Sequence, residues 1–471
     1  MGCRLHHAAQ DQNTVNALKN FFLIENREFA PRGGSEKKRE TAMTHSPVCI
    51  SAIGAITPLG DTLDQVSAAL QEGRTGIRTI KKFATDTYAT KWAGLPELGN
   101  DTIRWPRERP GQVARPGEIL YAEKALNRLL AEFNPSDAYQ ADRIGCVIGV
   151  DEPAIDIERC SDLLAKIGVE NSNDREKLVA NAIEHFRVSE LLDLDVTSVV
   201  RAIHRQVRFS GYTRCHVGLC SASLQALGMA TAAIDDGRID AAIVGGVSAK
   251  VTPLNVARLE GIGAVCTDPQ LEGPARSRPF DARRSGFIPA EGAILFVVER
   301  EDAVRRRGHT PYARLMGYGA SLSAEHIVAP HTQDREMFLC MQRALAHSGL
   351  KAQDISCINA HGTSTKLNDL HESRAIRRLF GDTPMPPVTA AKSLHGHLIA
   401  AAGAMEVMGV IANFRDDFIG AIRNLDEVDP RIEVPLARST RSIRLNNVLK
   451  NSFGMGGLAS SMVLQNPSLA A

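Results

Sequence analysis

The sequence predicts an α/β protein in which buried, mostly parallel strands alternate with helices. The apolar runs RIGCVIGV (143–150) and DAAIVGG (240–246) contain no alternating polar residues, which is typical of strands covered on both faces. Between them, SASLQALGMATAAIDDG (221–237) is rich in small residues and ends in glycine, as helices often do. Apolar residues make up 44% of the chain and charged residues 23%, which argues against a disordered protein.

The same alternation of strands and helices continues from Val48 to the C-terminal region. We predict further strands at VCISAIGA (48–55), TRCHVGL (213–219), DISCINA (354–360), VLKNSFG (448–454) and LASSMVLQ (458–465). We predict further helices within TPLGDTLDQVSAALQEG (57–73), LNDLHESRAIRRLFG (367–381) and HLIAAAGAMEVMGVIANF (397–414). The charged stretch 151–205 is helical in period and has no clear place in this pattern.

The first 45 residues differ from the rest of the chain. They are polar, mixed in charge and without a sustained apolar period, and Met43 comes directly before the first strand segment. We therefore predict that residues 1–45 form a disordered or mis-started tail.

Charge and cysteine content exclude several classes of function. Lys and Arg total 55 against 54 Asp and Glu, so a net charge of +1 indicates neither a nucleic-acid nor an anionic-membrane partner. The nine cysteines are scattered without a CxxC pair, which favours neither a disulfide framework nor a zinc ribbon and predicts a reducing, cytoplasmic setting. The sequence contains no apolar run of about 18 residues, so it predicts no membrane span.

Common catalytic motifs are also absent from the sequence. It contains no GxGxxG after a strand, no GxxxxGK[ST], no HExxH and no GxSxG. Nucleotide cofactors, zinc-protease chemistry and serine-hydrolase chemistry therefore have no support.

Cys220 stands between a predicted strand and the small-residue helix that follows it. A thiol at a helix N-terminus lies at the positive end of the helix dipole and beside free backbone N–H groups, which favour the thiolate. Buried cysteines are more often inert apolar residues. On local grounds alone, Cys220 is a candidate nucleophile, and an inert buried cysteine is the stronger interpretation.

Two histidines also lie beside glycine at the ends of strands. His361 opens HGTST, and His397 lies in KSLHGHLIAAAG, with Lys392 before it and Glu406 further along the helix. Glycine beside such a histidine allows a ligand to approach closely. Taken singly, each histidine is more often a hydrogen-bonded structural group, and Lys392 alone reads as a surface lysine.

The combination of four ordered motifs is far more specific than any one of them. GLCSAS, NAHGTST, KSLHGHLIAAAG and NSFGMGG occur in this order, each at the end of a strand. In this the sequence resembles the β-ketoacyl synthases, the condensing enzymes of fatty-acid and polyketide synthesis, and in particular the elongating branch that depends on an acyl carrier protein. The resemblance runs from residue 48 to residue 465, and RPFDARRSGFIPAEGAILFVVE (278–299) also fits the family.

The resemblance implies a thiolase-like fold, a five-layered αβαβα sandwich of two related halves. The halves are expected at residues 46–300, with the nucleophile, and 301–471, with the two histidines. The resemblance implies a homodimer or a heterodimer with a related subunit, and an acyl carrier protein as the partner that delivers acyl and malonyl thioesters. It implies no nucleic-acid partner and no metal or redox cofactor.

The resemblance also implies a role for each site residue. Cys220 is expected to be the nucleophile, and His361 and His397 the paired catalytic histidines. Lys392 is expected to orient the second histidine's surroundings with Glu406 as its partner. The backbone N–H groups of Cys220 and Met455 are expected to form the oxyanion hole, and the remaining supporting residues are Thr363, Thr365 and Phe453.

This chain departs from the family pattern in its glycine-rich loop. Elongating members usually have Phe at the position of Met455, where it gates the acyl pocket, and Thr-Asn where Leu458 and Ala459 stand. These differences favour a specialised polyketide or lipid synthase over a general fatty-acid elongase. Two alternatives stay open: a catalytically idle, chain-length-type partner of an active synthase, and an acyltransferase or thioesterase.

Overall fold

Ten strands form one sheet in the computed structural model, which describes residues 46–97, 117–152, 157–168, 173–186 and 195–469. Along the sheet the order is β10-β9-β13-β14-β8-β1-β7-β6-β4-β5. The strands of the first half are β1 (Val48–Ile56), β4 (Ile144–Val150), β5 (Thr213–Val217), β6 (Ala241–Ser248) and β7 (Gly292–Arg300). Those of the second half are β8 (Ala313–Leu322), β9 (Cys357–Asn359), β10 (Val388–Thr389), β13 (Asn447–Gly454) and β14 (Leu458–Gln465).

The two halves of the sheet have the same strand order. When the strands of each half are counted along the chain, both halves run third, second, fourth, fifth and first from the outer edge to the junction. In each half the outer three strands run parallel, and the fifth strand is antiparallel to both of its neighbours. At the junction β1 pairs with β8 through Cys49 and Ile50. This repeat confirms the predicted fold of two related halves, while the boundary at residue 300 stays a prediction.

The prediction of a mostly parallel sheet was wrong. Among the described strands, four of the nine pairings along the sheet are parallel and five are antiparallel. A continuous apolar run shows that a strand is covered on both faces, but it carries no information about strand direction. In addition, β5 was predicted as buried, yet as the edge strand it is largely half-buried, with Val217 46% exposed.

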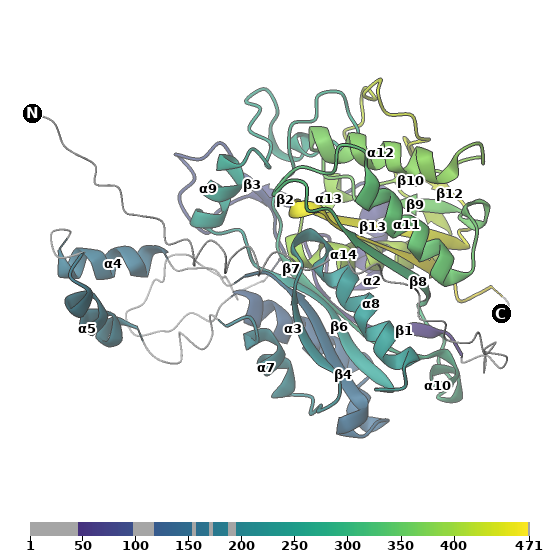
Figure 1. The fold of residues 1–471 in the computed structure, drawn as a ribbon, viewed down its shortest axis with the longest axis horizontal. Helices are drawn as coiled ribbons and strands as arrows, with labels where there is room; N and C mark the ends of the chain where they lie inside the picture. The colour runs from purple at the N-terminus through teal and green to yellow at the C-terminus, as the bar shows by residue number, and fades with distance from the viewer. Residues whose placement is uncertain (1–45, 98–116, 153–156, 169–172, 187–194, 470–471) are drawn as a thin grey trace, which may run out of the picture. The chain divides into compact units, whose positions relative to one another are not determined.

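Helices cover the sheet halves and separate them, giving five layers (Figure 1). The outer helices of the first half are α3 (Gly117–Glu132) and α7 (Ser198–His204). The outer helices of the second half are α11 (Arg335–Ser348) and α12 (Lys366–Phe380). Between the halves lie α8 (Ala222–Asp235) and α14 (Ala402–Asp416), which contact strands from both.

The remaining helices and strands are short. The helices are α2 (Leu63–Glu72), α4 (Ile157–Ile167), α5 (Arg175–His185), α9 (Pro253–Gly261), α10 (Glu301–Arg306) and α13 (Lys392–His395). Two small sheets pair β2 (Ile77–Thr79) with β3 (Trp92–Gly94), and β11 (Phe418–Ile419) with β12 (Arg441–Ser442). The stretch 151–205, which is helical in period, contains α4, α5 and α7.

Small residues allow the two central helices to approach each other closely. An added Cβ at Gly403 of α14 would lie 2.9 Å from the backbone nitrogen of Leu224 in α8. Both helices are buried along almost their whole length, which explains why their sequences lack a polar face. Because α8 follows Cys220 and α14 follows His397 in the chain, the packing of these helices brings the two residues to the same region of the core.

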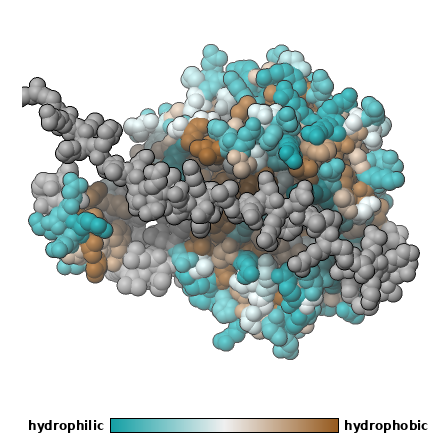
Figure 2. Space-filling view, in the orientation of Figure 1, coloured by the Kyte–Doolittle hydropathy of each residue, from teal (hydrophilic) through white to brown (hydrophobic). Residues whose placement is uncertain are grey.

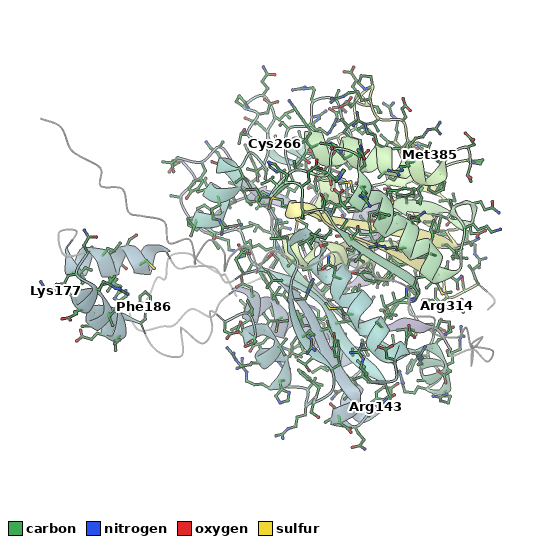
Figure 3. The ribbon with its side chains drawn as sticks, in the orientation of Figure 1. Arg143, Lys177, Phe186, Cys266, Arg314 and Met385 are labelled. Atoms are coloured by element: carbon green, nitrogen blue, oxygen red, sulfur yellow. The ribbon has the colours of Figure 1, made fainter. Side chains whose placement is uncertain are left out.

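A buried ion pair lies at the junction of the halves. Arg314 of β8, labelled in Figure 3, contacts both carboxylate oxygens of Glu301 at 2.6 and 2.9 Å. Figure 2 shows a mainly hydrophilic surface over α12, so the apolar residues of this half are turned toward the core. Among the described residues, no helix combines the length and apolar character needed to cross a membrane. The predicted tail, residues 1–45, lies outside the described residues.

Candidate active site

Cys220 lies on a strained turn between β5 and α8. The preceding residue, Leu219, has a φ of +48°, in the left-handed region that side chains with a Cβ rarely adopt. Cys220 belongs to the short 3₁₀ helix η4 (Leu219–Ser221), and it is 5% exposed. The Ser452 hydroxyl, from β13, donates a hydrogen bond to the Cys220 carbonyl at 2.9 Å. The turn is therefore fixed from both halves of the protein.

Burial outweighs the groups that stabilise the Cys220 thiolate. It raises the pKa of Cys220 to about 12, although Lys392 and the backbone N–H groups of Met455 and Cys220 act to lower it. The backbone N–H groups at this turn do favour the thiolate, as expected, but in the free site burial outweighs them. A helix terminus stabilises negative charge only near its first turn, whereas burial removes the water that would stabilise the charged sulfur.

His361 follows β9 and is held through its backbone by a buried carboxylate. Glu372, in α12, accepts hydrogen bonds from the backbone N–H groups of His361 at 2.8 Å and Gly362 at 2.9 Å. Gly362 has a φ of +47°, and an added Cβ would lie 2.6 Å from Ala390, so glycine suits this turn. The Lys392 ammonium lies 3.2 Å from Nδ1 of His361.

His397 follows a second glycine turn after β10 and α13. Gly396 has a φ of +75°, where an added Cβ would lie 2.9 Å from the Cβ of Ala290. The backbone N–H of Ile399 donates to Nδ1 of His397 at 3.1 Å. Ile399 itself has a φ of +42°, so strain again accompanies a site residue. The Phe287 ring packs edge-on against His397, with ring centroids 4.8 Å apart.

The structure brings the three predicted reactive residues together. The Sγ of Cys220 and one ring nitrogen each of His361 and His397 all lie within 4.8 Å of one another, and all three residues are buried. The two imidazole rings are nearly perpendicular, with centroids 5.3 Å apart. They come from segments separated by 141 and 36 residues in the chain.

Both histidines carry their proton on Nε2. Nδ1 of His397 accepts from a backbone N–H, and Nδ1 of His361 faces an ammonium group, so neither Nδ1 can hold a proton. Nε2 of His397 has no hydrogen-bond partner among the described residues. Cysteine and histidine are also zinc ligands, but a neutral imidazole binds a metal through an unprotonated nitrogen. With their protons on Nε2, the two histidines are better suited to donate hydrogen bonds from that nitrogen than to bind a metal through it.

Burial also keeps both histidines uncharged. It holds the pKa values of His361 and His397 well below the ordinary value of 6.5, and the nearby Lys392 lowers them further. For His361, a hydrogen bond to the backbone of Phe453 acts in the opposite direction. Neutral imidazoles with Nε2–H groups can donate hydrogen bonds to a developing negative charge.

Lys392 is completely buried and, as predicted, is paired with Glu406, but the histidine that it contacts is His361 and not the expected His397. Its ammonium contacts Oε1 of Glu406 and donates to the backbone carbonyl of His361. A second buried lysine, Lys450 of β13, lies 2.7 Å from Oε2 of the same glutamate. Burial acts to raise the pKa of Glu406, but the two lysines outweigh it and lower the pKa.

Comparison with known proteins shows the family of the chain. Residues 122–303 match the family model described as the N-terminal domain of β-ketoacyl synthase, and residues 312–426 match its C-terminal domain. The chain is 30% identical over 429 residues to 3-oxoacyl-[acyl-carrier-protein] synthase 2 of Synechocystis, covering 90% of this chain and 96% of the relative. The chain belongs to the β-ketoacyl synthase family.

Two further relatives come from polyketide synthesis. The ketoacyl synthase alpha subunit of the tetracenomycin polyketide synthase from Streptomyces glaucescens is 30% identical over 432 residues, covering 89% of this chain and 97% of that one. A ketosynthase solved with its type II polyketide acyl-carrier protein has the same fold, with a TM-score of 0.78 at 22% identity over 89% of this chain and 99% of that one. The predicted enzyme class is confirmed: this chain is a synthase that forms carbon–carbon bonds in fatty-acid or polyketide synthesis.

The supporting residues of the synthase lie at different distances from the reactive group. The Phe453 ring packs edge-on against His361, with centroids 5.8 Å apart, and the Met455 N–H points at the Cys220 sulfur. Thr363 and Thr365 hydrogen-bond to each other through their hydroxyls at 2.9 Å. Among the described contacts, none joins either threonine to the cysteine or the two histidines.

Sequence reasoning missed two buried charged residues of the synthase site. Lys450 stands directly before NSFGMGG in a predicted strand, where an alternating pattern would place it on an exposed face. Glu372 lies in a helix rich in charged residues, so its burial was not visible either. The one available signal was position, because Lys450 directly precedes a motif that was itself recognised.

Proposed function

We propose that this synthase carries an acyl group as a thioester on Cys220 and condenses it with the enolate formed from a malonyl thioester. The observation that carries the proposal is the convergence of the Cys220 sulfur with one nitrogen of each of His361 and His397 within 4.8 Å. A nucleophile and two uncharged donors in one buried space are what this two-stage reaction needs.

In the first stage the Cys220 sulfur attacks the carbonyl carbon of an acyl thioester. The S–C bond forms, the bond to the carrier's sulfur breaks, and the proton of the Cys220 thiol goes to that departing sulfur. We propose the N–H groups of Cys220 and Met455, which both act on the sulfur in the free site, as the donors that stabilise the oxyanion. Lys392 adds positive charge in the same buried region.

In the second stage the malonyl thioester loses CO₂. The electron pair of the broken C–C bond becomes an enolate, whose oxygen accepts hydrogen bonds from Nε2–H of His361 and His397. The enolate carbon then attacks the acyl carbonyl, and the bond from that carbon to the Cys220 sulfur breaks as the 3-ketoacyl thioester forms. The departing sulfur takes a proton from solvent, which restores the thiol. Because both histidines stay neutral, neither has to lose a proton before donating.

The partners and setting of the synthase are part of the same proposal. An acyl carrier protein, present in the name of the Synechocystis relative, is the proposed donor of both thioesters. The alpha-subunit name of the Streptomyces relative supports a dimer with a related subunit, and a homodimer is the other arrangement. We place the reaction in the cytoplasm, because the cysteines of the sequence are scattered and include no CxxC pair.

The chain retains every group that condensation requires, which argues against an idle partner subunit. An idle subunit needs no nucleophile, whereas Cys220 is kept on a strained turn beside two neutral histidines. An acyltransferase or thioesterase would not need the two Nε2–H donors that an enolate uses.

The Cys220→Ala variant tests the proposal. We expect no acyl-enzyme by mass spectrometry and no condensation, while malonyl-carrier protein still releases CO₂. His361→Ala and His397→Ala should instead lose CO₂ release, since the enolate is no longer held. Full condensation by Cys220→Ala would contradict the assignment of the nucleophile.

A further inference from the structure

A second polar group of residues lies at the same edge of the sheet as Cys220. Asp151 directly follows β4, Ser248 ends β6, and Cys220 comes three residues after β5. β4 is the middle strand of these three parallel strands, and it is in register with both neighbours at its last residue. Since parallel strands end at one edge of a sheet, the three residues gather there.

Asp151 is buried without a hydrogen-bond partner. It is 5% exposed, and neither of its carboxylate oxygens forms a hydrogen bond with any described residue. The hydroxyl of Ser248, which is fully buried, likewise forms no well-aligned hydrogen bond with a described residue, although it lies close enough to Asp151 to lower the pKa of that carboxyl. Native proteins rarely leave buried polar atoms unpaired, so such atoms call for a ligand or water.

Neighbouring charged groups do not satisfy Asp151. Lys250 directs its ammonium to the backbone carbonyl of Glu152 instead. By contrast, the buried Glu291 is fully paired, with Lys82 at 2.6 Å and Tyr121 at 2.8 Å. Burial raises the pKa of Asp151 to about 7, while Lys250 and the nearby Ser248 hydroxyl act to lower it.

Asp151 shares the buried space around the Cys220 sulfur. Its negative charge adds to the effect of burial in raising the pKa of that thiol. The close approach of β4 to the start of α8 agrees, because a Cβ added at Gly149 would lie 2.6 Å from the backbone nitrogen of Ser223. Both observations put this carboxylate and the Cys220 sulfur in the same buried region at the edge of the sheet.

We propose that Asp151, together with Ser248, selects acyl chains that carry a hydrogen-bond donor, a hydroxyl or an amino group, close to the thioester. The inference rests on the proposed acylation of Cys220. A donor on the chain pairs with the buried carboxylate, whereas a plain alkyl chain displaces water from it and leaves it unpaired. Sites built around such a polar group reject analogues that lack the partner.

The test compares acyl pantetheine thioesters of equal chain length: hexanoyl, 3-hydroxyhexanoyl and 3-aminohexanoyl. The readout is the rate of acylation of Cys220 in the full chain, followed by intact-protein mass spectrometry. We expect at least one hydroxy or amino substrate to acylate the wild type roughly 10- to 100-fold faster than hexanoyl. Whether hydroxyl or amino is preferred identifies the donor.

Variants separate Asp151 from a general effect of the fold. Asp151→Leu should remove or reverse the preference, and Asp151→Asn should keep part of it for a hydroxyl because its carbonyl still accepts. Glu152→Gln is the matched control, since its side chain is 44% exposed and pairs with Arg258. This control should keep the wild-type preference.

The outcomes are distinguishable from failure of the proposed function. Equal acylation rates for hexanoyl and all substituted chains in the wild type would overturn the role of Asp151 and leave the acyl-enzyme intact. A preference that persists in Asp151→Leu would do the same. No acylation of Cys220 by any thioester would overturn the proposed function, and this inference with it.

Discussion

Nζ of Lys450 lies 2.7 Å from Oε2 of Glu406, and both side chains are almost completely removed from water. The other carboxylate oxygen of Glu406 is held by Lys392, so one glutamate binds two buried ammonium groups. The group as a whole carries an excess of positive charge next to His361 and His397. That excess favours neutral imidazoles and stabilises negative charge on the substrate.

The Lys450 ammonium makes the stability of the fold depend on pH. Burial lowers the pKa of Lys450 from 10.5 to about 8. Between these values the unfolded chain binds a proton that the folded chain does not, so this group makes unfolding less favourable as pH rises. Relative to Lys450→Met, wild-type stability should rise by at most about 3 kcal/mol between pH 8 and 10.5.

Denaturant unfolding of the two proteins at several pH values measures this difference. A constant gap between wild type and Lys450→Met from pH 8 to 10.5 would show that Lys450 is charged throughout and would contradict the prediction. Lys450→Arg is the control, because a guanidinium keeps its charge over this whole range.

Because both histidines are neutral, we expect the rate of decarboxylation to stay nearly constant as the pH falls. Burial holds the pKa values of His361 and His397 well below 6.5, so both remain Nε2–H donors as pH falls from 7.5 to 5.5. CO₂ release from malonyl-carrier protein by Cys220→Ala should change by no more than about twofold over this range. A loss of about tenfold per pH unit below 6.5 would indicate histidines of ordinary pKa.

The Cys220 thiol should react slowly with small electrophiles at neutral pH. Because burial raises its pKa to about 12, its rate of alkylation by iodoacetamide should still be rising at pH 10. Lys392 lowers this pKa, so Lys392→Met should slow the reaction at every pH. Residue-resolved mass spectrometry measures the rate, with the partly exposed Cys160 as the internal reference. A plateau below pH 9 would contradict the burial effect.

Motifs predicted the reactive residues better than their electrostatics. Cys220, His361, His397 and Lys392 were found because each stands in a short pattern at a strand end. The thiol pKa was misjudged, since a sequence shows the helix N-terminus but not the layers that exclude water. Lys450 was missed for the same reason. Its burial depends on the two strands beside β13. β14 follows β13 after a turn, and β9 lies far from Lys450 in the sequence.

Strand direction was the other limit of the sequence. Apolar runs located β4, β6 and β13 well, because helices cover both faces of these strands. Direction depends on how the chain returns to the sheet. β14 runs antiparallel to β13 after a hairpin, and β7 runs antiparallel to β6 after a long connection. The residues of these strands do not indicate either direction.

The strained backbone before the nucleophile gives a last prediction. Leu219 has a φ of +48°, a conformation that costs residues with a Cβ about 1–2 kcal/mol and costs glycine little. Leu219→Gly and Leu219→Ala remove the same side-chain contacts, but only the alanine variant keeps the strained Cβ. Leu219→Gly should therefore be more stable than Leu219→Ala by about 1 kcal/mol in denaturant unfolding. Its condensation rate should nevertheless fall below that of Leu219→Ala, because a flexible glycine no longer fixes the Cys220 sulfur toward the two histidines. Equal stabilities would mean that the turn is unstrained, and a faster glycine variant would mean that the strain does not position the nucleophile.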